Sequence, residues 1–420
     1  MAPDSRAPSP PSPQPTASTA STSASGGAAR PLPRVGDPAL KSRFLLDPAV
    51  TYLNHGSFGA IPDSVFEAQE RWRRRIEQRP IELLGRRVRE LMLPAKQALG
   101  RIVGCAPAEI GFVTNATEAI NAVLNSLRFE RGDELLTTTH VYNAIRQAMR
   151  FTAERFGATV REAEIPWPCP SPAAVVDAFV GAISPATRLV VIDHVTSPTA
   201  LVLPIEPILE QCRRRGIMVI VDGAHAPGMI EIDLERLDAD AYAANLHKWL
   251  FAPKGCGMLR MSSGWRTRVH PCVISHFYGQ GFAEEFDWQG TRDVSPWLAL
   301  ADAIEFVESL GLRRIREHNH ALAAWAHAHL VERLGVPPMS PLDGSMLGST
   351  ATVRLPDSLR EQFGRFESLA AHLYDRERIE VPVIDFGGAW HVRISAQVYV
   401  TRDDIERLAE ALRRAIDRRS

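Results

Sequence analysis

From about residue 110 to residue 247, apolar runs of strand type alternate with stretches of helical spacing. Four runs predict buried strands, "GFVTN", "DELLTTT", "TRLVVIDHV" and "IMVIVDGA", and the strand-like "ADAYAANLH" comes next. Stretches between them, such as "ATEAINAVLNSLRF" and "IEPILEQCRRRG", repeat apolar residues at helical spacing. Apolar strands separated by helices are typical of a parallel sheet that is covered on both faces. We therefore expect an α/β fold with a doubly wound, mostly parallel sheet.

The pattern changes from about Pro296 to long helices, such as "LALADAIEFVESLG" and "HALAAWAHAHLVERLG", and a short mixed tail follows them. A chain of 420 residues is too long for one simple core, so two domains are expected. We place a large domain at 61–295 and a small C-terminal α+β domain at 296–420, preceded by an N-terminal segment at 39–60. Residues 1–38 are rich in Pro, Ser, Thr and Ala and are expected to form a disordered tail.

Charge and cysteine content exclude several classes of protein. The 48 basic and 49 acidic residues leave a formal net charge of -1, which argues against a nucleic-acid partner and against an anionic membrane surface. No apolar run is long enough to span a membrane. The five cysteines are scattered and form no CxxC pair, which argues against structural zinc and against a disulfide framework. This usage fits a reducing compartment, and we expect a cytoplasmic protein.

Lysine is rare in this chain, and one lysine stands in an apolar setting. The 48 basic residues include four lysines, namely Lys41, Lys96, Lys248 and Lys254. Lys248 lies directly after a strand-like run, between His247 and Trp249. A dry setting lowers the pKa of a lysine, and the free amine can then attack a carbonyl, which arginine cannot do. Lys248 is therefore a candidate for a Schiff base, although a surface lysine with a packed stem is the simpler interpretation.

Other polar residues follow predicted strands, at the edge where doubly wound sheets bind their ligands. Residues 114–121, "TNATEAIN", lead from a strand into a helix whose first N–H groups and Thr117 hydroxyl can cradle a phosphate. A plain helix N-cap with Glu118 in the first turn explains the same residues. Asp222 ends a buried strand, so its carboxylate needs a partner such as a protonated pyridine nitrogen, unless it only caps the next loop. His225 follows closely, and the two residues lack the third ligand that a metal site needs.

Six motifs carry a resemblance to a known family. They are "YLNHGSFG", "TNATEAIN", "VDGAHAPG", "NLHKWLFAPKG", "QGTRDVSP" and "RISAQVYV", and they match in the right order from about residue 50 to residue 415. Together they closely resemble the class V aminotransferase-like enzymes of fold type I, which use pyridoxal 5'-phosphate. Within that family they look most like the isopenicillin N epimerase group. The resemblance implies a fold-type-I transferase fold, pyridoxal phosphate as cofactor, a small amino-acid-type substrate and a homodimer with shared sites.

The resemblance also implies roles for individual residues around the cofactor. Lys248 would form the Schiff base, Asp222 would pair with the pyridine nitrogen, and His225 would lie near the phenolic oxygen. An aromatic ring would stack on the cofactor, and the segment "THVYNA" offers His140 or Tyr142 without deciding between them. The phosphate would be held by residues of three motifs, Ala116, Thr117, Asn245, His247 and, from the neighbouring subunit, Thr291.

On the substrate side, the resemblance places Arg393 at the substrate carboxylate, for which a guanidinium has the right geometry. Asn54 and His55 would lie near the substrate. Lys248, once displaced by the amino acid, would act as the base at Cα. Reprotonation from the other face, by Tyr142 or a bound water, would give epimerisation, which is the activity we expect.

Other outcomes stay open. Expulsion of a sulfur group would give a C–S lyase, and protonation at the cofactor carbon would give transamination. A cysteine desulfurase is disfavoured, because the segment before Arg393, "RERIEVPVIDFGGAWHVR", contains no cysteine. A non-catalytic binding module with the same fold is disfavoured by the presence of Lys248, Asp222 and Arg393 together.

Overall fold

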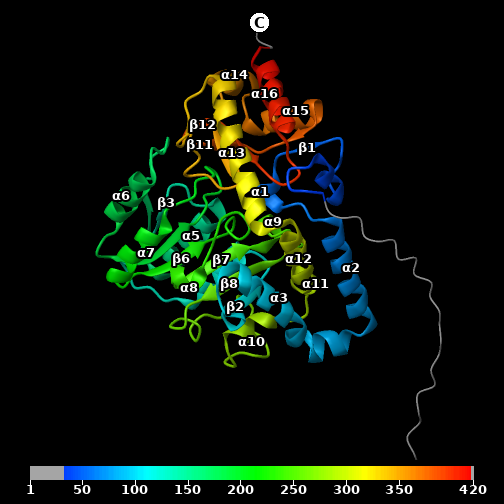
Figure 1. The fold of residues 1–420 in the computed structure, drawn as a ribbon. Coiled ribbons are helices and arrows are strands. Elements are labelled where there is room, and N and C mark those ends of the chain that lie inside the picture. The colour runs from blue at the N-terminus through cyan, green and yellow to red at the C-terminus, as the bar shows by residue number, and fades with distance from the viewer. Residues whose placement is uncertain (1–32, 418–420) are drawn as a thin grey trace, which may run out of the picture. The chain divides into compact units, whose positions relative to one another are not determined.

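A seven-stranded sheet forms the centre of the computed structural model, which describes residues 33–417 (Figure 1). The predicted N-terminal tail lies, as far as residue 32, outside the described residues. The strand order is β2-β8-β7-β6-β5-β3-β4. The strands are β2 (Ile110–Val113), β3 (Glu134–Thr138), β4 (Thr159–Ala163), β5 (Thr187–Asp193), β6 (Met218–Asp222), β7 (Ala241–Asn245) and β8 (Gly257–Met261).

Strand directions put several loops at one edge of this sheet. Strands β4, β3, β5, β6 and β7 pair in parallel, and β8 is antiparallel to both β7 and β2. Strand β2 therefore points the same way as β7, and the carboxyl ends of all strands except β8 meet at the same edge. The expectation of a mostly parallel α/β sheet is confirmed.

Burial explains which strands the hydrophobic pattern predicts. Strand β6 is buried throughout, and β5 is buried except at Arg188. Strand β4 pairs with one neighbour only, at the edge of the sheet, and exposes Thr159 and Arg161. An edge strand with one solvated face does not need a continuous apolar run. This is why the apolar pattern did not indicate β4.

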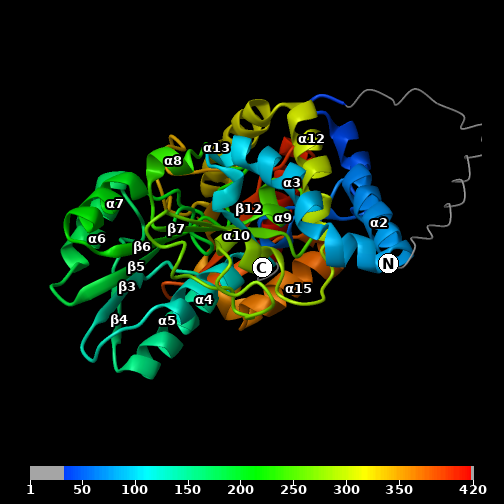
Figure 2. The same cartoon turned by 90° about the horizontal axis from the view of Figure 1, so that it is seen from below.

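Helices cover both faces of the sheet. Figure 2 shows helices α6, α7 and α8 on one side of the strands and α4 and α5 on the other. Apolar residues of α4, such as Ile120 and Val123, pack on Ala243 of β7 and Leu259 of β8. The helices are α4 (Ala116–Ser126), α5 (Asn143–Phe156), α6 (Pro172–Ala182), α7 (Ile205–Arg214), α8 (Leu234–Leu237) and α9 (Leu246–Trp249).

Smaller sheets join the two ends of the described chain. Strand β12 (Ala389–Ser395) is the middle strand of an antiparallel sheet, between β11 (Val383–Phe386) and β9 (Thr350–Arg354). Near the N-terminus, β1 (Thr51–Tyr52) pairs in parallel with β10 (Ile379–Glu380). The Ser395 N–H also donates to the Leu53 carbonyl at 2.9 Å, and the Gly56 N–H donates to the Ser395 hydroxyl at 3.0 Å. These bonds hold α1 (His55–Phe58) beside β12.

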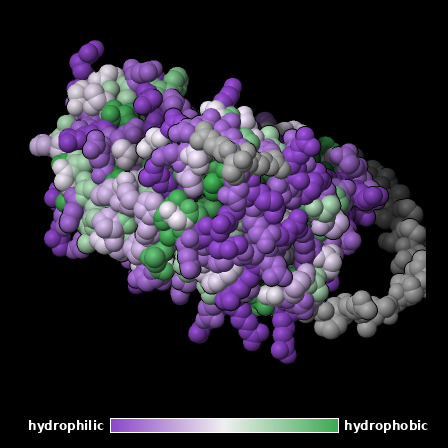
Figure 3. All heavy atoms as spheres, turned by 90° about the horizontal axis from the view of Figure 1, so that it is seen from above, coloured by the Kyte–Doolittle hydropathy of each residue, from purple (hydrophilic) through white to green (hydrophobic). Residues whose placement is uncertain are grey.

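The remaining helical elements lie before and after the large sheet along the chain. They are η1 (Pro38–Arg43), α2 (Asp63–Gln78), η2 (Ile81–Arg86), α3 (Val88–Val103), η3 (Pro107–Glu109), α10 (Phe282–Asp287), α11 (Ser295–Leu298), α12 (Leu300–Leu310), α13 (Leu312–Leu334), α14 (Asp357–Phe363), α15 (Phe366–Glu377) and α16 (Arg402–Asp417). Within residues 33–417, no helix has the length and apolar character needed to cross a bilayer. The face in Figure 3 is mainly hydrophilic, with a smaller hydrophobic group near its middle.

Candidate active site

A cavity of about 440 Å³ lies at the carboxyl edge of the large sheet. Its walls come from the ends of β2, β5, β6 and β7, from α1 and from β12. Nine of the predicted site residues line it, namely Ala116, Thr117, Tyr142, Asp222, His225, Asn245, His247, Lys248 and Arg393. The fold therefore brings residues from five sequence motifs into one cavity.

Lys248 lies in α9, directly after β7, and its side chain is buried. Its Nζ atom is 3.0 Å from Nε2 of His225. Burial lowers the pKa of Lys248 from 10.5 to about 7, and the positive charge of Arg393 lowers it as well, while Asp222 opposes the change. A large part of the protein therefore carries a free amine at this position at neutral pH, which is the nucleophilic form.

The hydrogen bonds of His225 fix the form of its ring. Burial lowers the pKa of His225 well below its ordinary value, so the imidazole is neutral. Trp249 Nε1 lies 3.4 Å from Nδ1 of His225, and because an indole N–H can only donate, this Nδ1 accepts. The ring proton then sits on Nε2, where it points at the lone pair of the Lys248 amine. His225 thus orients the nucleophile without adding a charge.

A buried carboxylate lies at the end of β6. Asp222 accepts a hydrogen bond from the Ala224 N–H at 2.9 Å. Burial raises the pKa of Asp222, while the Ala224 N–H and the charge of Lys248 act in the opposite direction. The aspartate is thus positioned to stabilise a cationic ring nitrogen in the cavity.

The first turn of α4 combines a helix cap with an open hydroxyl. Asn115 caps the helix by accepting from the Glu118 N–H at 2.9 Å, and Glu118 accepts from the Thr114 N–H at 2.7 Å. Asn245 accepts from the Ala116 N–H at 2.9 Å. In the described part of the chain the Thr117 hydroxyl has no hydrogen-bond partner, and it lines the cavity. The cap is therefore present, and the N–H groups of Ala116 and Glu118 are already bonded within the protein, so the Thr117 hydroxyl is the group of this turn that we expect to hold the phosphate.

His247 and Gly59 show how closely the N-terminal segment approaches this end of the site. His247 Nδ1 donates to the Cys256 carbonyl at 3.1 Å, and burial lowers the pKa of the ring to about 4. Gly59 has a φ of 72°, and a Cβ atom there would lie 2.0 Å from the His247 carbonyl oxygen. Only glycine fits both the positive φ and this contact.

Arg393 is a buried cation without a buried counter-ion. Its guanidinium donates to the Ser197 carbonyl at 2.5 Å, to the Ser197 hydroxyl at 3.1 Å and to the Ser57 hydroxyl at 3.2 Å. Its Nε has no hydrogen-bond partner, and within residues 33–417 no carboxylate forms an ion pair with it. Burial lowers the pKa of Arg393 to about 10, which still leaves it charged at neutral pH. A ligand carboxylate would supply the missing charge.

The structure separates the two rings offered by the β3–α5 loop. Tyr142 lines the cavity and is 47% exposed. His140 is buried, with its Nδ1 2.8 Å from the Thr199 hydroxyl, and its ring packs on Trp167 and Phe386. Of the two rings, Tyr142 lines the cavity and His140 does not, and which of them stacks on the cofactor stays a prediction.

Besides His140, three predicted residues lie outside the cavity lining. His55 is fully buried behind Lys248, where its Nε2 donates to the Lys248 carbonyl at 2.8 Å and its Nδ1 accepts from the Tyr399 hydroxyl at 2.7 Å. Asn54 donates to Glu380 at 2.9 Å and accepts from the Ser57 hydroxyl at 2.5 Å. Neither residue lines the cavity, and their expected closeness to the substrate stays a prediction. Thr291 is exposed between Gly290 and Arg292 and is not among the residues that line this cavity.

Several lining residues were not expected from the sequence. They are Gly56, Ser57, Phe58, Thr114, Asn115, Asp193, Ser197, Ala224, Lys254 and Gly255. Asp193 carried a usable signal, because "VVID" ends in aspartate in the same way as "VIVD" before Asp222. Ser57 and Ser197 had no comparable signal, since their contact with Arg393 depends on the tertiary fold.

These residues fit pyridoxal phosphate. The cavity volume is within the range of cofactor sites. Lys248 supplies a neutral amine for the aldehyde, Asp222 a carboxylate for the ring nitrogen, Thr117 an open hydroxyl for the phosphate, and Tyr142 a ring for the flat face. Arg393 leaves an uncompensated positive charge for a substrate carboxylate.

Comparison with known proteins agrees with this arrangement. The family model for aminotransferase class-V matches residues 59–408. Isopenicillin N epimerase from Streptomyces clavuligerus is 36% identical over 388 residues, which cover 89% of this chain and 96% of that protein. A putative L-cysteine desulfhydrase 1 from Oryza sativa subsp. japonica is 32% identical over a stretch that covers 87% of this chain and 83% of that protein. Among solved structures, a cysteine desulfurase from Thermococcus onnurineus NA1 has a TM-score of 0.77 at 20% identity, covering 92% of this chain and 100% of that one.

Proposed function

Because the chain belongs to the aminotransferase class-V family of pyridoxal-phosphate enzymes, we propose that it is an epimerase that inverts the Cα of an amino-acid-type substrate. The likeness to the epimerase over nearly its whole length supports this activity. The observation that carries the proposal is one cavity with a neutral lysine, a second proton-bearing side chain and a buried cation without a counter-ion. Pyridoxal phosphate, when bound, supplies an aldehyde for the amino group and a ring that accepts the electron pair left at Cα.

In this proposal Lys248 has two tasks. Its Nζ would hold the cofactor through its aldehyde and, as a free amine, would take the proton from Cα. The pKa of about 7 keeps the amine basic enough to accept a proton and neutral enough to be available at physiological pH. His225 holds Nζ from one side at 3.0 Å. His55 holds the backbone of Lys248 through its carbonyl at 2.8 Å.

Arg393 would bind the α-carboxylate of the substrate. Its position is set by Ser197 and by a chain of hydrogen bonds from Ser57 through Asn54 to Glu380. A guanidinium held in one plane can bind a carboxylate through two parallel N–H groups. Fixing the carboxylate at Arg393 and the amino group at the cofactor leaves one orientation for the Cα–H bond, which turns toward Lys248.

Inversion needs a second acid on the other side of Cα, and we assign this task to the phenol of Tyr142. Tyr142 lines the same cavity as Lys248 and Arg393. It is half exposed, so its hydroxyl can exchange protons with water between turnovers. Lys248 would remove the proton, and Tyr142 would return one from the opposite face.

A C–S lyase is the second candidate, because L-cysteine desulfhydrases are among the relatives of the chain. Loss of a β-sulfur group needs the same base and carboxylate site but no second acid at Cα. Of the described residues that line the cavity, none is a cysteine, which does not favour the desulfurase activity that needs a thiol nucleophile. Transamination and a non-catalytic binding role remain weaker alternatives.

The test uses purified enzyme with pyridoxal phosphate in deuterated water. The substrates are a panel of L-amino acids, including amino acids whose side chain carries an N-acyl group. Epimerisation predicts deuterium at Cα together with loss of optical purity, and Lys248→Ala abolishes both. Release of pyruvate, ammonia and sulfide from cysteine would establish the lyase instead. A protein that binds the cofactor and yet changes no amino acid would contradict both candidates.

Assembly and location are part of the same proposal. We expect a homodimer in which Thr291 of each subunit reaches the phosphate bound by the other, because Thr291 is exposed and is not among the residues that line its own cavity. Large apolar side chains are exposed nearby in sequence, at Val273, Ile274 and Tyr278, and a subunit contact would cover them. All five cysteines are free thiols, which suits the cytoplasm.

A further inference from the structure

Two neighbouring strands of the large sheet end in aspartate at the same level. Asp193 ends β5, Asp222 ends β6, and the two Cα atoms are partners in the parallel register. Side chains at paired positions of adjacent strands point to the same face. Both aspartates line the cavity, and both are buried, with 2% and 3% of their surface exposed.

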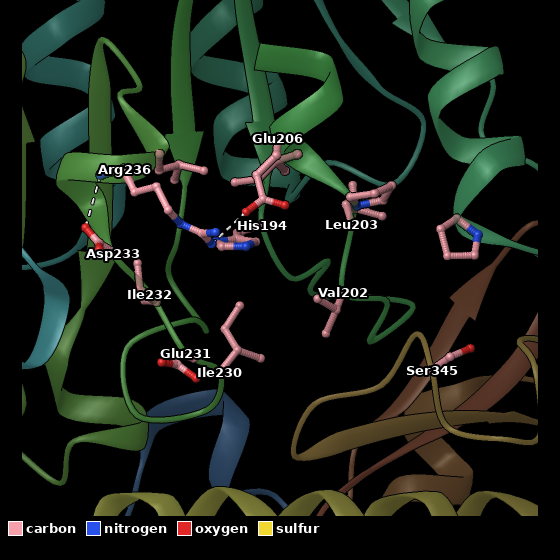
Figure 4. A pocket seen from close by; sticks show the side chains of 14 residues that line it. His194, Val202, Leu203, Glu206, Ile230, Glu231, Ile232, Asp233, Arg236 and Ser345 are labelled. Atoms are coloured by element: carbon pink, nitrogen blue, oxygen red, sulfur yellow. Dashed lines mark hydrogen bonds and ion pairs between the residues drawn. The ribbon is translucent and has the colours of Figure 1, made fainter. Parts of the chain in front are cut away.

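The next residue of the chain turns the other way. His194 lines a separate surface pocket with Glu206, Glu231 and Arg236, as Figure 4 shows. There its Nδ1 is 2.8 Å from the Tyr242 hydroxyl. Successive residues of a strand point to opposite faces, so the placement of His194 in that pocket directs Asp193 into the cavity.

The Asp193 carboxyl group accepts hydrogen bonds from the N–H groups of Asp193 and Tyr142, but one of its two oxygens accepts none from residues 33–417. Its Oδ2 is buried and, within the described residues, has no hydrogen-bond partner. The positive charge of Arg146 in α5 lowers the pKa of Asp193, but the Arg146 guanidinium is already paired with the Glu162 carboxylate at 2.8 Å. Asp222, in contrast, accepts from the Ala224 N–H, and in the part of the chain that the structure describes neither of its oxygens is both fully buried and without a hydrogen-bond partner. Of the two carboxyl groups, Asp222 is therefore the better site for the negative charge.

The pKa shifts of Asp193 and of its ionisable neighbours also favour a proton on Asp193. Burial raises the pKa of Asp193 well above its ordinary value, and the Asp222 carboxylate raises it further, while the N–H groups of Asp193 and Tyr142 and the charge of Arg146 lower it. Tyr242 of β7 lies on the other side of Asp222, and its phenol stays protonated because burial raises its pKa. Two ionised carboxylates side by side in a buried site repel each other.

We propose that Asp193 is a second carboxyl group of the cofactor site, which holds a proton beside ionised Asp222 so that the pair carries one negative charge. The proposal rests on the proposed function only in that it takes pyridoxal phosphate as the ligand. A single negative charge matches a single protonated ring nitrogen. Asp193 is thus a positioning residue, which fixes the charge of Asp222 and does not itself bear charge at neutral pH.

The experiment compares Asp193→Asn, Asp193→Ser and Asp222→Asn with the wild-type holoenzyme. Infrared difference spectra between wild type and Asp193→Asn at neutral pH should contain the C=O stretch of a protonated carboxylic acid. The visible absorbance of bound pyridoxal phosphate is then titrated with alkali. Wild type should show a transition above neutral pH that both Asp193 variants lack, because it is the ionisation of Asp193.

Cofactor affinity gives a third readout, which does not depend on turnover. Asp193→Asn keeps the charge of the pair, so its dissociation constant for pyridoxal phosphate should stay within about threefold of wild type. Asp222→Asn removes that charge and should weaken binding at least about tenfold. The serine variant gives the same comparison if asparagine disturbs packing.

The outcomes separate this inference from the proposed function. The inference is wrong if the infrared difference spectra show that the Asp193 variants have lost the band of an ionised carboxylate and not that of a carboxylic acid, because Asp193 is then ionised in wild type. It is also wrong if the Asp193 variants weaken pyridoxal phosphate binding as much as Asp222→Asn does. If the protein binds pyridoxal phosphate with these properties but converts no amino acid, the inference stands and the proposed activity fails.

Discussion

Replacing Arg393 by glutamine should abolish recognition of a substrate carboxylate without unfolding the protein. Arg393 is buried in β12 and donates to Ser197 and Ser57, which are both uncharged. A glutamine removes the charge, and its amide nitrogen reaches only the position of Nε, two bonds short of the Nη atoms that donate to Ser197 and Ser57. Comparing an amino acid with the amine that lacks its carboxylate therefore shows what the positive charge contributes to carboxylate binding.

The magnitude follows from the burial of the guanidinium. The fall in pKa from 12.5 to about 10 corresponds to about 3 kcal/mol by which the folded protein disfavours the charged form. The three hydrogen bonds to Ser197 and Ser57 return about 1 kcal/mol each. These contributions nearly cancel, so the free energy of unfolding should change by no more than about 1 kcal/mol. A ligand carboxylate paired with this charge should gain about 2–5 kcal/mol, equal to about 30-fold to several-thousand-fold in affinity.

The assay measures dissociation constants from the spectral change of the bound cofactor. Each protein is titrated with an amino acid and with the amine that lacks its α-carboxylate. Wild type should prefer the amino acid, and Arg393→Gln should show almost no preference. Arg354→Gln is the matched control, because Arg354 lies on the adjacent strand β9, opposite His391, and pairs with Asp357 on the surface.

Two results would refute this reasoning. An unchanged preference in Arg393→Gln would mean that another group binds the carboxylate. A loss of affinity for the amine as large as that for the amino acid, together with a lower unfolding midpoint, would mean that the guanidinium only supports the fold.

Three further predictions concern Lys248, Tyr142 and Thr291. Without cofactor, the folded pKa of Lys248 is about 7 and lies below its ordinary value of 10.5, so the unfolded chain holds more protons between these pH values. The unfolding free energy of cofactor-free wild type, measured by urea titration, should therefore rise relative to Lys248→Met between about pH 7 and 10.5, with no such rise below pH 7. Tyr142→Phe keeps the ring and removes the acid, so inversion should fall about 100-fold while deuterium exchange at Cα persists; equal loss of both rates would assign Tyr142 another task. Mixing inactive Lys248→Ala with Thr291→Asp subunits should restore activity in hybrid dimers, because one site then has both native residues; if each Thr291 serves its own subunit, mixing restores nothing.

The large sheet and its functional edge could be predicted because their signals are local. Buried strands need continuous apolar runs, and the residues that end them, Asp222 and Asn245, fall at the carboxyl edge by the direction of parallel strands. Lys248 was found by its rarity and its apolar neighbours. The resemblance to the family, and with it the fold class and the cofactor, is confirmed by the family match.

The rest depends on contacts between distant segments. His140 and Tyr142 are two residues apart, yet Trp167 and Phe386 hold one ring away from the cavity while the other lines it. His55 belongs to a motif associated with the substrate, but the fold places it behind Lys248. No periodicity encodes such contacts, since they arise only when the N-terminal segment packs beside β12.

The two ends of the cavity are incomplete in opposite senses. The buried guanidinium of Arg393 has no anion paired with it among the residues that the structure describes. The carboxylate of Asp222 accepts a hydrogen bond from the uncharged Ala224 N–H and has no cation paired with it among the same residues. Between them, Lys248 and His225 are held neutral by burial, so they do not compensate either charge. A ligand that combines a carboxylate with a protonated ring nitrogen satisfies both ends at once. The amino acid alone has no ring nitrogen, and the cofactor alone has no α-carboxylate. The compound in which the amino acid is joined to the cofactor should therefore bind more tightly than either one alone.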